Sequence, residues 1–309
     1  MTDRQSFFSG AALAVLACII WSGNFIVARA VIHQVPPVTL ALIRWSLATL
    51  VLLPFSIRPL LQQRRAIRER LLYFCCTAIC GVTVFNTFLY IAAHTTSAIN
   101  MALIGTCSSP VFSVILAAMF LKERVTGVRI GGMLLMLSGI LFLLARGNIQ
   151  NLASFRFTPG DLWVLGAAVF FAFYNILVRK KPASVSAAVF LFTTFSIGTI
   201  FLVPFSAWEM QHSPGIEWNT ELVMVVLYLG LGTSVVAFLL WNFSIARLGA
   251  ARTALFGNLI PLFSSVEAVL LLDEQITVVH IASAVLIIAG LLIANSRKQK
   301  RIPVYSADN

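Results

Sequence analysis

Residues Pro110–Leu141 read PVFSVILAAMFLKERVTGVRIGGMLLMLSGIL, and residues Pro261–Leu292 read PLFSSVEAVLLLDEQITVVHIASAVLIIAGLL. The two stretches align without a gap at an offset of 151 residues, and 12 of their 32 positions are identical. The identities include a proline, a glutamate, a threonine and a glycine, which a shared apolar composition does not explain. We infer that the chain contains a duplicated unit.

The composition points to the bilayer as the solvent of this unit. Hydrophobic residues make up 59% of the 309 residues and charged residues only 11%, whereas soluble domains carry about 25% charged residues. Apolar runs long enough to cross a bilayer recur along the chain. They are continuous rather than alternating, which favours helices over a β-barrel. We therefore expect an all-α polytopic membrane protein.

Ten spans are predicted, five in each repeat. The first run is too long for the apolar core of a signal peptide, and Trp21–Val27 aligns with Ala172–Val178 at the same offset, so we expect it to be a retained span. No soluble domain fits between the spans. The predicted spans are 8–31, 37–56, 71–93, 97–121, 128–145, 160–179, 184–207, 221–245, 250–272 and 277–295.

The net charge of +11 reflects membrane topology rather than a nucleic-acid partner. With these spans, 18 of the 22 Lys and Arg residues fall on one side, 3 on the other, and Arg44 lies within a span. Basic residues concentrate on the cytoplasmic side of membrane proteins. The bias predicts an inner (plasma) membrane protein with both termini in the cytosol, in contact with the lipid bilayer.

An odd number of spans per repeat inverts the second copy relative to the first. In agreement, Lys122-Glu123-Arg124 is matched by Asp273-Glu274-Gln275, which has lost both basic residues. Inverted repeats give many secondary transporters two conformations of similar energy and hence alternating access. We expect a first five-helix repeat, a linker, a second repeat and a basic cytosolic tail, at 8–145, 146–159, 160–295 and 296–309.

These motifs resemble those of a known family. The Pro–Glu–Thr–Gly pattern occurs once per half, Trp21-Ser-Gly-Asn24-Phe lies in the first span, and Arg44-Trp45 lies in the second. Together they resemble the EamA family of the drug/metabolite transporter superfamily over about residues 10–295. The resemblance implies ten helices, a central cavity between the halves, and export of amino acids or other small metabolites. Some similar members export aromatic or sulfur-containing amino acids.

Other function classes have weaker support in the sequence. The P-loop pattern of ATP-driven pumps is absent, and so are HExxH and paired intramembrane aspartates. A channel or sensor does not need two interconvertible halves, although a channel, a sensor and an intramembrane enzyme remain the alternatives to a carrier. The five cysteines lie in apolar spans without nearby His or acidic residues, so no metal or cofactor is expected. The substrate, the transport direction, the driving force and the choice between monomer and homodimer stay open.

Three sets of residues are candidates for the transport machinery. Pro110 and Pro261 recur at matched positions in spans four and nine, where a proline leaves a carbonyl unsatisfied and kinks the helix; the alternative is a packing kink.

Arg44 and Glu267 are charges within spans, and such groups are functional suspects. Glu267 is a candidate for coupling to protons, the alternative being a water-exposed position; Arg44 could instead snorkel to the headgroups.

Polar and aromatic residues near the middle of the spans are the candidates for lining a substrate cavity. Asn offers donors and an acceptor without a fixed charge, and aromatic rings can stack on an apolar group or attract an ammonium. The alternative is interhelical hydrogen bonding and core packing. The candidates are Trp21, Asn24, Asn86, Tyr90, Asn100, Tyr174, Asn175, Trp241, Asn242 and Asn258.

Two further motifs are expected to support the scaffold. Glu123 and Glu274 precede Thr126 and Thr277, each predicted to cap the following helix, with gate or stability roles implied for the glutamates by the resemblance. Small residues seven apart, Gly132 and Gly139 in one half and Ser283 and Gly290 in the other, predict close helix contacts.

Overall fold

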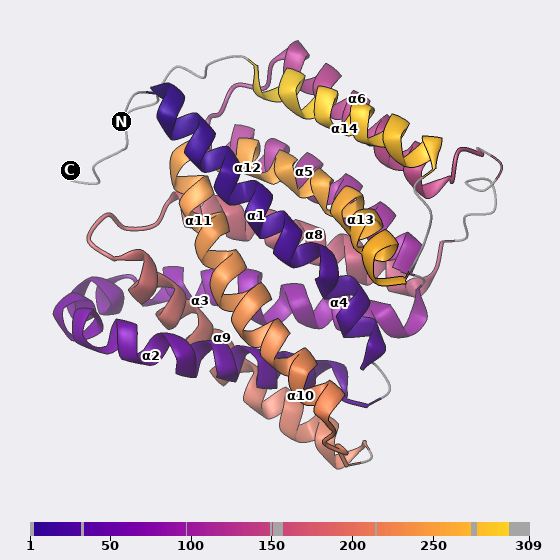
Figure 1. The fold of residues 1–309 in the computed structure, drawn as a ribbon. Helices are drawn as coiled ribbons and strands as arrows, with labels where there is room; N and C mark the ends of the chain where they lie inside the picture. The colour runs from indigo at the N-terminus through magenta and orange to yellow at the C-terminus, as the bar shows by residue number, and fades with distance from the viewer. Residues whose placement is uncertain are drawn as a thin grey trace.

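The structure is a computed structural model that describes residues 3–31, 34–96, 98–148, 150, 157–213, 215–272 and 277–296. Every regular element within these residues is a helix (Figure 1). The first half contains α1 (Asp3–Ala30), α2 (Pro37–Glu69), α3 (Leu71–Ala78), η1 (Ile79–Val84), α4 (Phe85–Thr95), α5 (Ala98–Leu121) and α6 (Gly127–Leu144). The second contains α8 (Pro159–Arg179), α9 (Ala187–Gln211), α10 (Thr220–Leu227), η2 (Tyr228–Val236), α11 (Ala237–Leu248), α12 (Ala250–Phe256), η3 (Gly257–Leu259), α13 (Ile260–Leu272) and α14 (Val278–Asn295).

These helices correspond to the ten predicted spans. Eight helical stretches of the described chain are long and apolar enough to cross a membrane. The fourth predicted span corresponds to α5, and the ninth is divided into α12, the 3₁₀ turn η3 and α13. The third and eighth spans each contain a π-helical segment, η1 and η2. The prediction of an all-α polytopic membrane protein is confirmed.

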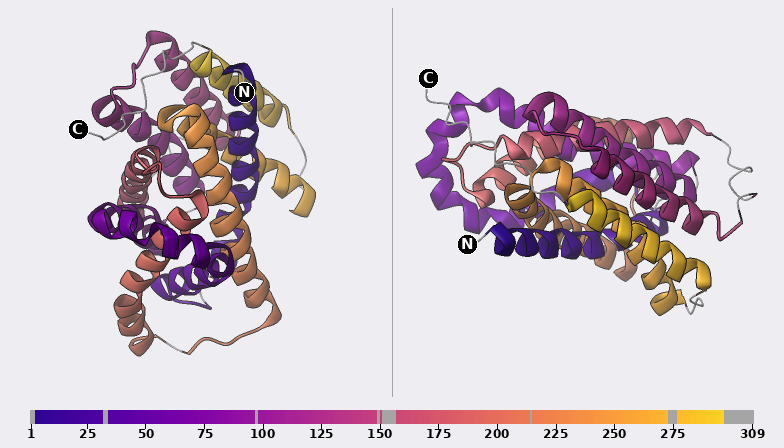
Figure 2. Two further views of the ribbon diagram at one scale, coloured as in Figure 1. Left: turned by 90° about the vertical axis from the view of Figure 1, so that its left-hand side faces the viewer. Right: turned by 90° about the horizontal axis from the view of Figure 1, so that it is seen from above.

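The two halves pack with the pattern that a two-fold relation requires. Matched helices pack on each other across the halves: α2 on α9, and α6 on α14. In addition, α1 packs on α11 and α13, and its repeat equivalent α8 packs on the equivalent helices α4 and α5. Figures 1 and 2 show α6 beside α14 along one edge of the molecule. The contacts of α1 with the second half therefore have counterparts in the contacts of α8 with the first half.

The α6–α14 contact is close, as the small residues predicted, and it is antiparallel. A Cβ atom on Gly132 would lie 2.5 Å from the backbone nitrogen of Ala294, and one on Gly139 would lie 3.1 Å from that of Ile287. The contact therefore moves backwards along α14 as it moves forwards along α6. A Cβ atom on Gly290 would lie 2.6 Å from the Gly132 carbonyl oxygen. Glycine allows the two backbones to touch here.

Helix α2 is longer than its predicted span. The predicted span ends at residue 56, and residues 57–70 were expected to be a connection. The helix instead continues to Glu69 through Pro54 and Pro59. The continuation is rich in Leu, Gln, Arg and Glu, which are good helix formers. Gln63 in this extension accepts a hydrogen bond from the backbone N–H of Ser186, 2.9 Å away, at the start of α9.

Glu209 fixes the opposite end of the α2–α9 pair. Its carboxylate accepts from the backbone N–H groups of Val38 (3.1 Å) and Thr39 (2.7 Å), and from the Thr39 hydroxyl (2.8 Å). The first N–H groups of a helix have no partner within the helix, and a carboxylate at this end also interacts favourably with the helix dipole. The N-terminus of α2 is thus capped by a side chain from α9 in the other repeat.

Candidate substrate site

One turn of α1, Trp21 to Asn24, contacts several elements of the candidate site. The Trp21 indole nitrogen donates to the Thr233 carbonyl oxygen in η2, 2.9 Å away. The Ser22 hydroxyl donates to Glu267 in α13. Asn24 accepts from Arg44 in α2, 3.3 Å away. The motif noted in the sequence therefore lies where a basic and an acidic side chain approach the same helix.

The Arg44 guanidinium is buried, with 1% of the residue exposed. Its Nη1 donates to Asn24, to Asn86 Oδ1 at 2.8 Å and to the Tyr90 hydroxyl at 2.8 Å. Its Nε donates to the Ser234 hydroxyl at 2.5 Å, and its central carbon lies 4.9 Å from the ring centroid of Trp45. All four acceptors are neutral. Three predicted cavity residues thus meet around a predicted intramembrane charge.

The second repeat has an equivalent polar cluster without a charge. Asn175 and Trp241 occupy the positions that match Asn24 and Tyr90 at the 151-residue offset. The Trp241 indole nitrogen donates to Asn175 Oδ1 at 2.9 Å, and Asn175 Nδ2 donates to the Ser113 hydroxyl at 3.2 Å. The position that matches Arg44 holds Phe195. The two halves are therefore similar in hydrogen bonding and different in charge.

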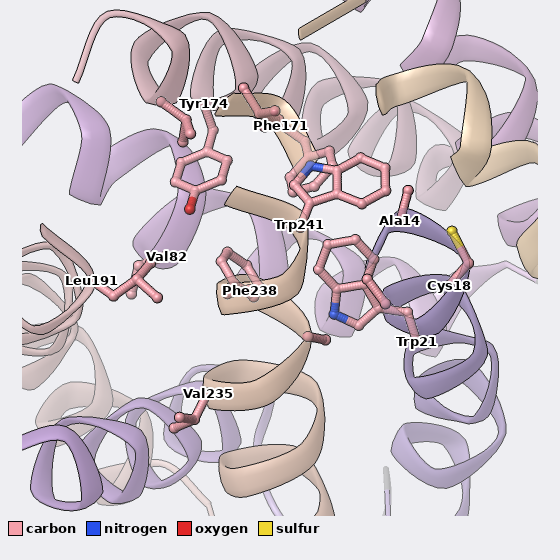
Figure 3. Packing of buried hydrophobic residues seen from close by; sticks show 14 of the residues in the cluster. Ala14, Cys18, Trp21, Val82, Phe171, Tyr174, Leu191, Val235, Phe238 and Trp241 are labelled. Atoms are coloured by element: carbon pink, nitrogen blue, oxygen red, sulfur yellow. The ribbon is translucent and has the colours of Figure 1, made fainter. Parts of the chain in front are cut away.

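An aromatic cluster connects the two polar centres (Figure 3). The Trp21 ring centroid lies 4.9 Å from that of Trp241, 5.5 Å from that of Phe238 and 5.8 Å from that of Phe171. The rings come from α1, α8 and α11, so both repeats contribute. Figure 3 shows the Trp21 and Trp241 indoles next to each other. Such surfaces suit the apolar part of a small organic molecule.

The π-helical segments were not predicted, although they occur at equivalent places in the two repeats. In η2 the hydroxyls of Thr233 and Ser234 both donate to the Leu229 carbonyl oxygen at 2.8 Å. In this π-helical segment the Ser234 hydroxyl accepts a hydrogen bond from Arg44, and the Thr233 carbonyl oxygen accepts one from Trp21. The available sequence signal was a shared Gly-x-Thr/Ser pattern, Gly81 to Thr83 matching Gly232 to Ser234. Single π segments are frequent at functional sites.

Glu267 forms the acidic part of the site. One of its carboxylate oxygens accepts from Ser22, and the other, Oε2, is buried without a hydrogen-bond partner among the described residues. The Tyr228 hydroxyl donates to the Ile20 carbonyl oxygen, 2.5 Å away, on the same side of α1. A Cβ atom on Gly23 would lie 2.6 Å from the Tyr228 oxygen and 3.6 Å from Glu267 Oε2. The glycine thus allows both side chains to reach α1.

The remaining candidates lie at different places in the fold. Tyr174 donates to Asn242 Oδ1 at 2.9 Å beside the aromatic cluster. Asn258, in η3, donates to the Leu255 carbonyl oxygen at 3.2 Å and to Met136 Sδ at 3.6 Å, contacts separate from those of Arg44. Pro110 and Pro261 are buried; α5 is α-helical through Pro110, whereas η3 ends just before Ile260-Pro261. The Asn100 side chain lies outside the described residues.

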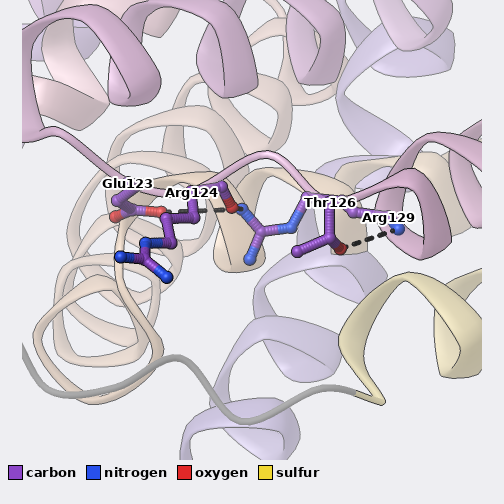
Figure 4. A network of polar contacts seen from close by, with 4 residues as sticks. All are labelled: Glu123, Arg124, Thr126 and Arg129. Atoms are coloured by element: carbon purple, nitrogen blue, oxygen red, sulfur yellow. Dashed lines mark hydrogen bonds and ion pairs between the residues drawn. The ribbon is translucent and has the colours of Figure 1, made fainter.

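Glu123 lies on the connection between α5 and α6 (Figure 4). Its Oε2 is 3.9 Å from Arg129 Nη1, and both side chains are buried. Thr126 caps α6 by accepting from the Arg129 backbone N–H at 3.3 Å, which confirms the predicted cap. A Cβ atom on Gly249, whose φ is +93°, would lie 3.1 Å from Glu123 Oε1. Glu123 therefore joins this connection to the turn between α11 and α12.

The equivalent cap in the second repeat is also confirmed. Thr277 precedes α14, and its backbone N–H donates to His280 Nδ1, 3.2 Å away, in a capping box. Glu274 lies outside the described residues. Within the described part of the chain, no group of three or more His, Cys, Asp or Glu side chains could hold a metal ion.

A family comparison identifies the architecture. The model of the EamA-like transporter family matches residues 8–145 and again residues 158–296. The chain belongs to this family. A solved structure titled only "Crystal structure of protein" has the same fold, with a TM-score of 0.71, 21% identity, and coverage of 93% of this chain and 96% of that one.

Relatives of this EamA-like protein carry transporter names. It is 27% identical over 293 residues to a probable amino-acid metabolite efflux pump of Escherichia coli (strain K12), covering 91% of this chain and 93% of the relative. It is 28% identical over 287 residues to a probable terminal-alkyne amino-acid exporter of Streptantibioticus cattleyicolor, covering 92% of each chain. An uncharacterized transporter of Archaeoglobus fulgidus is 25% identical over 290 residues, with 93% of this chain and 98% of the relative covered. This EamA-like protein is therefore a membrane transporter.

Proposed function

We propose that this EamA-like protein is a secondary transporter that exports small amphipathic metabolites, amino acids or similar compounds, by alternating access. The main support is the duplicated packing around α1 and α8. Each of these helices presents an asparagine, Asn24 or Asn175, to a polar cluster, and each packs against helices of the other repeat. Two such halves can exchange conformations around a fixed central site.

The substrate class follows from the site and from the relatives' names. The Arg44 and Asn175 clusters supply polar groups, and the rings of Trp21, Trp241 and Phe171 supply an apolar wall between them. Amphipathic molecules fit this combination. Two relatives are named for amino-acid metabolite efflux and amino-acid export, which supports the same class.

Coupling to protons is part of the proposal and centres on Glu267. Its unpartnered Oε2 and its contact with Ser22 place a carboxylate beside α1, where protonation would change the hydrogen bonding of a helix at the repeat interface. We propose an inner-membrane location with both termini in the cytosol, from the distribution of basic residues. We also propose that residues 8–145 and 160–295 are the two repeats, with 146–159 as the linker.

Reconstitution into proteoliposomes tests the carrier mechanism. A carrier gives uptake that saturates with substrate concentration, and counterflow, in which unlabelled substrate inside drives accumulation of labelled substrate. Unsaturable flux without counterflow would indicate a channel instead. Candidate substrates should come from a metabolite screen that compares the medium of overexpressing cells with that of controls.

A further inference from the structure

The Arg44 guanidinium has no acidic side chain as a direct partner. No ion pair joins it to any residue that the structure describes, and the nearby acidic group of the site, Glu267, accepts from Ser22. Arg44 instead donates to three neutral side chains through Nη1 and to Ser234 through Nε. A buried cation in a low-dielectric interior is costly unless it is paired. The site therefore favours the entry of an anion.

Two buried donors beside Arg44 also have no partner. Asn86 uses its Oδ1 to accept from Arg44, and its Nδ2 has no hydrogen-bond partner among the described residues, although Asn86 is only 1% exposed. The Trp45 indole nitrogen, whose ring lies 4.9 Å from the guanidinium, has no partner either. Buried donors are normally satisfied, so two of them beside an unpaired cation indicate a missing acceptor.

We propose that Arg44 and Asn86 bind the carboxylate of the transported molecule. The inference rests on the proposed carrier function and specifies its substrate class: monocarboxylates with an apolar body, which includes zwitterionic amino acids. Arg44 Nη2, which donates to none of the described residues, can give a charged hydrogen bond to the carboxylate, and Asn86 Nδ2 supplies a second donor. The apolar body would then contact the rings of Trp21 and Trp241.

The single positive charge of Arg44 favours a ligand with a single negative charge at this position. The Arg44 guanidinium can balance one negative charge of the ligand, whereas a phosphate dianion would bring a second negative charge to a site that already contains the Glu267 carboxylate. The asymmetry of the repeats agrees with this assignment. The position that matches Arg44 is Phe195, whose ring lies 4.6 Å from that of Trp45, so the second half contributes apolar surface to the same region.

Matched ligand pairs on the purified, lipid-reconstituted protein test the proposal. The pairs are 3-phenylpropanoate and 3-phenylpropanamide, hexanoate and hexanamide, and L-phenylalanine and L-phenylalaninamide, all at equal chloride concentration. We expect the melting temperature to rise with the acid of at least one pair and not with its amide. Equal effects of acid and amide in every pair, or no effect of any acid, would overturn the assignment.

Variants locate the binding at Arg44. Asn86→Asp supplies an internal carboxylate next to the guanidinium without changing the shape of the side chain, so the protein should stay folded while the acid loses affinity. We expect the affinity for the acid to fall at least about tenfold, because the new carboxylate competes with the ligand for the guanidinium. Arg65→Gln, at a side chain that is 91% exposed, is the control and should leave acid binding unchanged. Unchanged acid affinity in Asn86→Asp would overturn the assignment.

The outcome separates this inference from the carrier proposal. Saturable counterflow of a substrate that binds equally well as its amide would overturn the carboxylate site and leave the carrier intact. Binding that depends on Asn86 and on the carboxylate, without any flux of the same compound, would leave the site and overturn the carrier.

Discussion

The Trp241 indole nitrogen donates to Asn175 Oδ1 at 2.9 Å, at positions equivalent to Tyr90 and Asn24, which both accept from Arg44. The same two positions thus carry a hydrogen-bonded pair in one repeat and two ligands of a guanidinium in the other. The duplication preserved the polar positions while their chemistry diverged. The Arg44 charge therefore has no equivalent in the second repeat, and the acidic residue of that repeat, Glu267, matches Leu116 in the first.

The substitution Trp241→Phe removes the indole N–H, so the buried Asn175 Oδ1 loses its hydrogen-bond donor. We expect the free energy of unfolding to fall by about 1–3 kcal/mol, the usual cost of an unsatisfied buried polar group. Thermal unfolding in detergent measures the change. Trp218→Phe, at a residue that is 55% exposed, is the control and should have little effect. Equal effects of the two changes would contradict a specific role of the hydrogen bond.

Glu267→Gln tests proton coupling. The amide keeps the size of the side chain and can still accept from Ser22, but it cannot exchange a proton between about pH 5 and 9. We expect transport in proteoliposomes to lose its dependence on an imposed pH gradient while exchange of substrate for substrate continues. Glu217→Gln, at an exposed residue, should keep the wild-type pH dependence. Full, pH-dependent transport by Glu267→Gln would exclude Glu267 as the coupling group.

Gly132→Ala should separate α6 from α14. The added Cβ atom would lie 2.5 Å from the Ala294 nitrogen and 2.6 Å from the Gly290 oxygen, so backbone would have to move. Overpacking of this kind costs about 1–3 kcal/mol. The neighbouring Gly131→Ala has nothing within 4 Å of the new atom and should be neutral or slightly stabilising, because alanine favours helix. Melting temperatures of the two variants give the comparison.

Sequence reasoning recovered what depends on composition and periodicity. Helices at the positions of the ten predicted spans, the caps at Thr126 and Thr277 and the close contact at Gly132 follow from local signals, and the structure has them. The hydrogen bonds of Arg44 depend on which helices pack against α2. The residues around Asn24 and Asn86 in the sequence do not indicate that Arg44 is their partner.

The irregular segments escaped prediction for a different reason. The π-helices η1 and η2 carry the same apolar composition as the α-helices on either side, so hydropathy does not distinguish them. The extension of α2 beyond residue 56 was not predicted, because the spans were assigned from hydropathy and the polar residues of the extension are typical of a loop.

Glu209→Ala should weaken the contact between α2 and α9. The carboxylate accepts from two backbone N–H groups and one hydroxyl at the start of α2, and loss of a cap costs about 0.5–2 kcal/mol. Glu217→Ala, in the exposed segment after α9, provides the control. Thermal unfolding of both variants checks the effect. A loss for Glu217→Ala as large as that for Glu209→Ala would show that removal of any acidic group at this end of the protein is sufficient.

The inverted topology predicts opposite accessibility of two residues that the repeat relates. Arg124 follows Glu123 on the predicted cytosolic side, and Gln275 is its partner at the 151-residue offset. In a variant without the native cysteines, Arg124→Cys should react with a membrane-impermeant maleimide only after the cells are permeabilised, whereas Gln275→Cys should react in intact cells. Labelling of both from the same side would mean that the repeats are parallel. That result would overturn the inverted-repeat prediction and remove the support that inversion gives to the alternating-access proposal.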